Sequence, residues 1–365
     1  MNNLTILLPT RNRAEFLKRA LEFYSFNRLG AKIIVGDSSS DNQSKALIAE
    51  YTSRLDIVYL SYPFEADIVD KWIDMFGHAK SELILSISDD DLFFVEGIKD
   101  ACKFLDNHKD YSASGGQSML FTIDNDDIYG NISSWRCEKL QSVKLGTPEL
   151  RIHEKLANYN ASWYLVHRHA VLERFVEALK SKRDVIDLWL PELIESSFSA
   201  IYGKIRVQNR PFMYRQIHAR RTASSTKNHP QNILEWLVSE GAKKRNEAFV
   251  DVVSDELTHV SSYDKAVAKQ KVEQYFWCYV AYTFYCLYVP PKNVMSMAFS
   301  RYHVIKKLRK IRKKLHKFKI TGMIHEMLNS KETVPYVELP LIKKLSYNRY
   351  LHEVEEFVRE EHNYL

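Results

Sequence analysis

The sequence has few of the residues that build long loops or cross-linked scaffolds. Of its 365 residues, 11 are Gly and 10 are Pro, which leaves little room for long disordered linkers. The four cysteines have neither the compact spacing of a zinc site nor the density of a disulfide framework. We therefore expect reduced thiols in a cytosolic compartment.

Long apolar runs are also missing. No basic region precedes the first apolar run, residues 4–8, and Pro9-Thr10-Arg11 ends it, so the N-terminus does not resemble a secretion signal. Residues 275–289 are uncharged and rich in aromatic side chains, but they fall short of the ~20 apolar residues that cross a bilayer. We predict a buried or interfacial helix there, in a cytoplasmic protein.

Acidic residues are absent between Glu273 and Glu326, whereas this interval holds eleven Lys or Arg. The other 41 basic residues stand against 46 acidic ones, so the formal charge of +6 arises locally. Within residues 295–320, basic side chains alternate with apolar ones at helical spacing, which predicts a basic amphipathic helix. We favour contact with an anionic membrane surface, peripheral on the inner membrane face. The other interpretation is a helix that packs on the protein with a solvated basic face.

Short strands alternate with helices over the first hundred residues. Helical periodicity marks residues 14–24 and 68–76. The alternation predicts an α/β fold with a mostly parallel sheet and helices on both faces, in which ligands bind beyond the carboxyl ends of the strands. From residue 231 onward the pattern is helical. The expected strands are residues 4–8, 32–35, 57–60, 83–87, 119–123, 162–167 and 205–208.

Three consecutive aspartates, Asp89, Asp90 and Asp91, directly follow the apolar residues 83–87. Adjacent carboxylates repel each other at a strand end, so they need a compensating cation, and oxygen ligands suit Mg²⁺ or Mn²⁺. A metal held in this way can bind a diphosphate. The alternative is an Asp-rich helix start, but one Asp is enough for a cap.

Three segments, taken in order, resemble motifs of the family 2 glycosyltransferases with the GT-A fold, particularly the bacterial enzymes of surface polysaccharide synthesis. Residues 9–13, PTRNR, are similar to the family's P-T-x-N-R start. Residues 35–41, VGDSSSD, are similar to its V-D-D-G-S-x-D turn, with Gly36 in place of the first Asp. The aspartate run looks like its DxD motif. The resemblance covers roughly residues 1–220.

The resemblance implies a nucleotide-sugar donor, expected to be a UDP-sugar. Asp37 would contact the base alone, because Gly36 replaces the family's other carboxylate. Lys71, on the following helix, would reach a phosphate or else be an ordinary solvated lysine. The residues expected to bind the nucleotide sugar are Pro9, Thr10, Arg11, Arg13, Asp37, Lys71, Asp89 and Arg215.

The expected cofactor is Mn²⁺ or Mg²⁺, and two registers of the metal motif stay open. A literal DxD uses Asp89 and Asp91, whereas alignment on the apolar residues that follow makes Asp90 the main ligand, which we favour. The fold often adds a late His, and His218 follows the last expected strand, although it is also interpretable as a surface residue of a polar loop. The predicted metal ligands are Asp90, Asp91 and His218.

In an inverting enzyme of this family, the general base is an Asp or Glu near a helix start beyond the second half of the sheet. Asp187 matches best, Asp184 second and Glu192 third. Shielding by Trp189 would raise the pKa of a nearby carboxyl, as suits a base at neutral pH. Helix capping is the alternative role for either Asp. The aromatic residues that would contact the acceptor, unless they belong to the core, are Trp163, Tyr164 and Trp135.

The predicted organisation is a GT-A domain over residues 1–227, with a nucleotide-sugar half at 1–110 and an acceptor half at 111–227, followed by a helical region at 228–365. The predicted function is metal-dependent, inverting transfer of a sugar to a hydroxyl of a saccharide or lipid-linked acceptor. One alternative is a sugar nucleotidyltransferase, but its Gly-rich phosphate loop is missing. The other is a non-catalytic module that binds an anionic surface or nucleic acid through the basic helix. We expect no nucleic acid partner, because the basic run has few aromatic residues.

Overall fold

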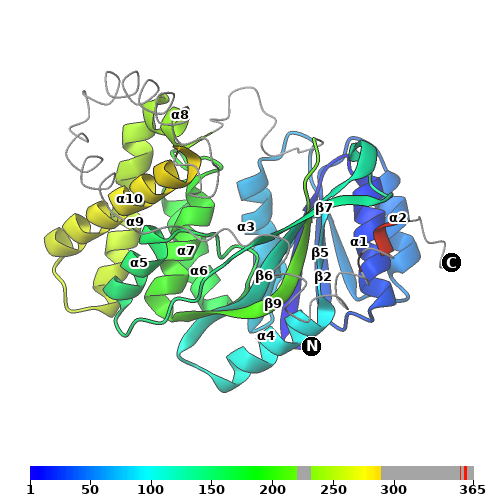
Figure 1. Cartoon of the computed structure of the whole chain (residues 1–365), viewed down its shortest axis with the longest axis horizontal. Coiled ribbons are helices and arrows are strands. Elements are labelled where there is room, and N and C mark those ends of the chain that lie inside the picture. Colours follow the sequence, from blue (N-terminus) through cyan, green and yellow to red (C-terminus); the bar gives the residue numbers. More distant parts are fainter. Residues whose placement is uncertain (220–231, 289–353, 355–356, 360–365) are drawn as a thin grey trace, which may run out of the picture.

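A central sheet runs between two groups of helices in the computed structural model (Figure 1). The structure describes residues 1–219, 232–288, 354 and 357–359. The expected domain boundary near residue 227 and the basic helix at 295–320 lie outside the described residues.

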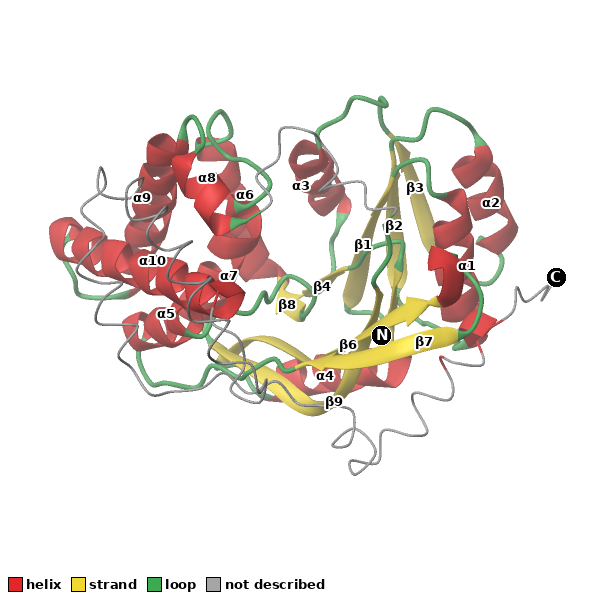
Figure 2. Cartoon of the chain, turned by 45° about the horizontal axis from the view of Figure 1, so that its top comes forward, coloured by secondary structure: helices red, strands yellow, loops and turns green. Residues whose placement is uncertain are grey.

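The first half of the sheet is parallel, in the order β3-β2-β1-β4. Figure 2 shows α1 and α2 on one face of these strands and α3 on the other. The predicted alternation of strands and helices is therefore confirmed. Its elements are β1 (Leu4–Thr10), α1 (Ala14–Phe26), β2 (Lys32–Asp37), α2 (Gln43–Tyr51), β3 (Ile57–Ser61), α3 (Ile68–His78) and β4 (Leu83–Ser86).

The second half of the sheet is mixed and continues from β4 in the order β8-β6-β9-β5, with β7 paired to β6. β6 is parallel to β9, whereas the pairs β4–β8, β6–β8, β6–β7 and β5–β9 are antiparallel. Trp135, one of the expected acceptor residues, lies on β7 and pairs with Phe121 of the long strand β6. The elements are β5 (Asp91–Phe93), α4 (Val95–Asn107), β6 (Tyr111–Ile123), β7 (Ile132–Glu138), β8 (Val166–Arg168) and β9 (Lys204–Gln216).

Alternate residues of each strand face different cores, as the twofold repeat of a strand requires. Leu7 and Ile34 belong to a core shared with α3 and the helical end of the molecule, whereas Ile6 and Ile33 face α1. Near-continuous apolar strands such as β1 and β4 are thus explained by burial on both faces.

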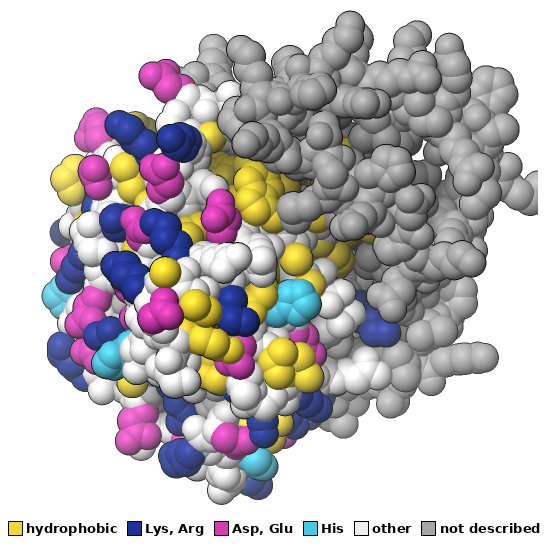
Figure 3. Space-filling view, turned by 90° about the vertical axis from the view of Figure 1, so that its left-hand side faces the viewer, with side chains coloured by type: hydrophobic (Ala, Val, Ile, Leu, Met, Phe, Trp, Pro, Cys, Tyr) yellow, Lys and Arg dark blue, Asp and Glu magenta, His cyan; other side chains and the backbone are white. Residues whose placement is uncertain are grey.

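The remaining helices gather at one end of the molecule (Figure 1). α10 packs on α9 and α5, and α7 packs on α5, α6 and α9. Residues 275–288 of the expected helix form the second half of α10, where Phe276 and Tyr279 are buried. On the described surface of this end, basic and acidic side chains are interspersed (Figure 3). These elements are α5 (Pro148–Ala157), α6 (His169–Ser181), α7 (Leu190–Tyr202), α8 (Ile233–Val238), α9 (Ala242–Val260) and α10 (Lys265–Tyr288).

None of the helices described in the structure is both long and apolar enough to span a bilayer.

The C-terminal part of the chain returns to the first half of the sheet. Val354, Phe357 and Val358 are buried in the core that contains α1. The ring of Phe357 meets that of Phe23 edge to face, with 5.1 Å between centroids. The N–H of Gly130 donates a hydrogen bond to the carbonyl of Val358 at 2.8 Å. The core around α1 is therefore completed by residues distant from it in the sequence.

Candidate functional site

The three aspartates connect β4 to β5, at the carboxyl edge of β1 and β4. Asp89 is buried, and its carboxylate accepts a hydrogen bond from the hydroxyl of Thr10 at 2.8 Å. Arg13, just beyond β1, forms an ion pair with Asp89 at 2.9 Å. Burial raises the pKa of Asp89 although the charge of Arg13 opposes the rise. The first and third sequence motifs thus meet in one cluster.

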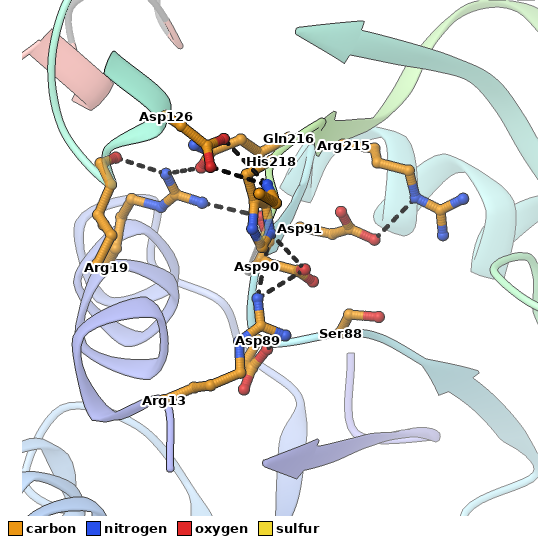
Figure 4. A network of polar contacts seen from close by, with 12 residues as sticks. Arg13, Arg19, Ser88, Asp89, Asp90, Asp91, Asp126, Arg215, Gln216 and His218 are labelled. Atoms are coloured by element: carbon orange, nitrogen blue, oxygen red, sulfur yellow. Dashed lines mark hydrogen bonds and ion pairs between the residues drawn. The ribbon is translucent and has the colours of Figure 1, made fainter. Parts of the chain in front are cut away.

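Asp90 is shared between Arg13 and His218. Its Oδ2 lies 2.8 Å from Nη2 of Arg13 and 2.9 Å from Nε2 of His218, and the two nitrogens are 3.2 Å apart (Figure 4). Burial would raise the pKa of Asp90, but the hydrogen bond to His218 and the charge of Arg13 lower it below its ordinary value. His218 stacks on Phe16 with 4.8 Å between centroids, and Arg13 lies over the same ring. His218 is buried, in contrast to the surface interpretation.

Asp91 points away from this pair, toward Arg215 (Figure 4). It begins β5 and stands opposite Arg215 of β9, with 3.3 Å between Arg215 Nε and its Oδ2. Burial raises the pKa of Asp91, and Arg215 opposes the rise. The guanidinium of Arg215 also lies 4.5 Å from the ring centroid of Tyr164. Asp91 therefore belongs to a second pairing, separate from Asp90 and His218.

The repulsion among the three carboxylates is offset by arginines. Arg13 pairs with Asp89 and Asp90, and Arg215 pairs with Asp91. In the described part of the chain, no three His, Cys, Asp or Glu side chains converge as a complete metal centre. The donors Asp90 and His218 nonetheless converge, and the cationic Nη2 of Arg13 already lies beside both. Because Mg²⁺ is commonly held by one or two carboxylates together with substrate phosphates, these residues fit a divalent ion as a partial ligand set.

The loops after β1 and β2 are tied together beside the cluster. The backbone N–H of Asn12 donates to Ser39, and the side chain of Asn12 accepts from the backbone N–H of Ser40 at 2.9 Å. Asp37 is buried and accepts hydrogen bonds from Ser39 and from the hydroxyl of Tyr59. These bonds hold the loop that carries the second motif against the first.

Lys71 is buried, unlike an ordinary solvated lysine. Its ammonium donates to the carbonyl of Thr10 and to the hydroxyl of Ser38, both at 2.9 Å, and so joins the ends of β1 and β2. Burial lowers the pKa of Lys71 to about 8, although Asp37 opposes the change. The ammonium of Lys71 thus lies at the carboxyl ends of β1 and β2.

Two further residues of the first motif lie along the same edge. Pro9 pairs with Gly36 across β1 and β2, and Arg11 lies over the exposed ring of Phe64 at 5.4 Å. A Cβ atom on Gly36 would come within 2.3 Å of the sulfur of Met75. Packing of α3 against β2 therefore accounts for glycine where the family motif has aspartate.

Asp187 caps the start of α7. Its Oδ1 accepts the backbone N–H groups of Trp189 and Leu190 at 2.9 and 3.2 Å. Its Oδ2 accepts Nε1–H of Trp236 at 2.6 Å and lies 3.1 Å from Nε of Arg245. Asp184 is exposed in the preceding turn.

Glu192, in the first turn of α7, lies in a different environment. It is half-buried, and it accepts a hydrogen bond from the hydroxyl of Tyr159 at 3.1 Å. Burial raises the pKa of Glu192, and the charge of Arg215 opposes the rise. Glu192 therefore lies within electrostatic range of Arg215, which pairs with Asp91 of the aspartate run.

The expected acceptor residues differ in their surroundings. The hydroxyl of Tyr164 lies 3.1 Å from that of Ser88, immediately beside the aspartates. Trp163 packs against the rings of Trp72 and Phe175 in the core. Trp135 packs against Phe121 on the neighbouring strand. Of the three, Tyr164 is next to the cluster.

Sequence reasoning missed Arg19, which is fully buried beneath the cluster. Its Nη2 donates to the backbone carbonyl of Asp90 at 2.8 Å, and its Nη1 donates to Oε1 of Gln216 at 2.6 Å (Figure 4). One signal was present: Arg19 lies three residues after Phe16 and four before Phe23, on the apolar face of α1.

Comparison with known proteins identifies the fold. No family model matches the chain, and no curated protein sequence does. The crystal structure of S. aureus TarS 1–349 in complex with UDP-GlcNAc is similar with a TM-score of 0.51 and 14% identity, covering 85% of this chain and 81% of that one. The mannosyltransferase PcManGT from Pyrobaculum calidifontis, in complex with GDP-Man and Mn²⁺, covers 98% of this chain and 84% of that one at 10% identity. Its TM-score of 0.43 is too low to support an inference. The described chain therefore has the GT-A fold that its motifs predicted.

Proposed function

We propose that this protein is a glycosyltransferase that moves a sugar from a nucleotide-sugar donor to a hydroxyl of a saccharide or lipid-linked acceptor. The observation that carries the proposal is the convergence of Arg13, the aspartate run and His218 at the carboxyl edge of a GT-A sheet. Ligands of open α/β sheets bind at this edge. TarS, which shares the fold, was crystallised with UDP-GlcNAc.

The donor's diphosphate is expected beside Arg13 and Arg215, because both guanidinium groups match phosphate oxygens. Lys71 stabilises the ends of β1 and β2 that face the nucleotide. Asp89, hydrogen-bonded to Thr10, lies at the ribose side in this arrangement, and Asp37 with its loop lies at the base.

A divalent metal, Mn²⁺ or Mg²⁺, would be held by Asp90 and His218 and would neutralise charge that develops on the leaving diphosphate. Binding of the metal requires Asp90 to be ionised, and the lowered pKa of Asp90 ensures this at neutral pH. Asp91, paired with Arg215, is not expected to be a direct ligand.

We propose Glu192, ahead of Asp187, as the general base. Both oxygens of Asp187 already accept hydrogen bonds, from Trp189, Leu190 and Trp236, so they serve as a helix cap and an indole acceptor. The raised pKa of Glu192 suits proton abstraction near neutral pH. In an inverting reaction, the acceptor oxygen bonds to the anomeric carbon, the bond from that carbon to the diphosphate breaks, and the acceptor proton passes to Glu192.

The test is calorimetric titration of the protein with UDP, CMP and GDP, with and without Mn²⁺. We expect one nucleotide to bind, with higher affinity when Mn²⁺ is present, and we expect Asp90→Asn to lose the effect of Mn²⁺. Asp110→Asn is the matched control, because Asp110 is a surface carboxylate paired only with Lys204 in the described contacts. Absence of binding for every nucleotide would refute the proposal.

A further inference from the structure

The loop between β6 and β7, residues 124–131, is bonded to the site at three points. Arg19 Nη1 donates to the carbonyl of Ile128 at 2.7 Å. Gln216 Nε2 donates to the carbonyl of Asp127 at 2.6 Å. The carboxylate of Asp126 accepts the backbone N–H of Ala219, the residue after His218 (Figure 4). The 124–131 loop thus contacts Arg19, which is hydrogen-bonded to the backbone of Asp90, and the residues around His218.

The opposite side of this loop is held by the C-terminal residues. Gly130 donates its N–H to the carbonyl of Val358, and Phe357 is buried beside α1. Gly130 has φ +145°, a conformation that side-chain-bearing residues avoid, and its Cβ position would lie 3.0 Å from Ile123. The position of the loop therefore depends on a glycine and on residues from the far end of the chain.

We propose that Arg19 is a positioning residue for Asp90 and His218, acting with the 124–131 loop, which Val358 holds in place. Nη2 of Arg19 donates a hydrogen bond to the backbone carbonyl of Asp90. Its Nη1 donates to the carbonyl of Ile128 in the loop and to the side chain of Gln216. It also lies over Phe16, on which His218 stacks. One buried guanidinium therefore touches the supports of both proposed metal ligands. This inference rests on the proposed function.

Arg19 should affect metal binding because the affinity of a site with two protein ligands depends on the spacing of those ligands. The structure keeps Arg19 fully buried against three oxygen acceptors, which is costly unless each hydrogen bond is made. Supports of this kind around metal ligands commonly change metal affinity by about 10–100-fold when they are removed.

The experiment measures Mn²⁺ binding rather than turnover. Free Mn²⁺ is followed by its electron paramagnetic resonance signal, in the presence of the nucleotide that binds the wild type, and metal-free nucleotide affinity is measured by calorimetry. We expect Arg19→Met and Gly130→Ala each to weaken Mn²⁺ binding by about tenfold or more. Metal-free nucleotide affinity should change by less than about threefold, since neither residue faces the proposed nucleotide loops. The Mn²⁺ affinity of Arg19→Lys should lie between those of the wild type and Arg19→Met, because one ammonium cannot reach all three acceptors.

Phe249→Ala controls for general destabilisation, because Phe249 is buried in the helical end of the molecule. It should lower the melting temperature and leave Mn²⁺ affinity unchanged. If Arg19→Met does not fold, Gly130→Ala decides the matter, since Gly130 lies outside the site. If Gly130→Ala and every folded Arg19 variant bind Mn²⁺ as tightly as the wild type, the inference about Arg19 is overturned, whereas the proposed function is not. A wild type that binds neither nucleotide nor Mn²⁺ would overturn the proposed function as well.

Discussion

Replacement of Asp187 by alanine separates a structural carboxylate from a catalytic one. The change removes the cap of α7, which is worth about 1 kcal/mol. It also leaves the buried indole N–H of Trp236 without its acceptor, at a cost of about 1–3 kcal/mol. The partly buried ion pair with Arg245 adds about 1 kcal/mol. We therefore expect Asp187→Ala to lower the free energy of unfolding by about 3 kcal/mol.

Glu192→Gln should show the opposite pattern. Glutamine keeps the shape and an oxygen acceptor for Tyr159, so the free energy of unfolding should change by less than about 1 kcal/mol. Loss of the base should reduce kcat by about 10²–10⁴-fold while nucleotide affinity is retained.

The assay combines urea unfolding with nucleotide release from the sugar nucleotide that binds the wild type. A fully stable Asp187→Ala that retains nucleotide binding but is at least about 100-fold slower would refute our assignment and identify Asp187 as the base.

Three further predictions concern residues outside the base. Gly36→Ala should lower the free energy of unfolding by about 1–3 kcal/mol, because its Cβ would overlap Met75, and a denaturation curve measures this. Cys102, whose pKa burial raises to about 12, should react with iodoacetamide much more slowly at pH 8 than the exposed Cys286, as peptide mass spectrometry would show. Lys71 has a pKa of about 8 in the folded protein against 10.5 for an ordinary lysine, so between these values the unfolded chain binds the extra proton and stability should rise with pH. The free energy of unfolding, measured in urea at pH 7.5 and 9.5, should therefore rise less in Lys71→Met than in the wild type. An identical rise in the two proteins would contradict the lowered pKa of Lys71.

Local patterns sufficed for the parallel first half of the sheet and its helices, and for the placement of the second and third motifs at strand ends. Those features depend on periodicity and on short motifs at strand ends, which are visible within about ten residues. The same information could not distinguish a base from a cap at Asp187, because the donor Trp236 is 49 residues away in sequence.

Charge compensation was equally hard to assign from sequence. The aspartate run suggested a metal because no cation stands next to it in the chain. In the folded protein Arg13 and Arg215 reach it from 76 and 124 residues away, and their charges offset part of the repulsion among the carboxylates. Lys71 became buried because it lies between Ile68 and Trp72 on the inward face of α3, a position that its charge alone argued against.

The return of Val354, Phe357 and Val358 to the first core has a consequence for biosynthesis. The strands and helices of residues 1–86 emerge from the ribosome early, yet the core around α1 lacks part of its packing until residues 354–358 have been made. Folding from the N-terminus can therefore form the sheet during translation, but the core around α1 closes only after synthesis of the segment that ends at residue 358. Nonsense or frameshift changes in the last few codons before this point should produce chains that fold incompletely and are removed by proteases, even though every proposed site residue has been translated.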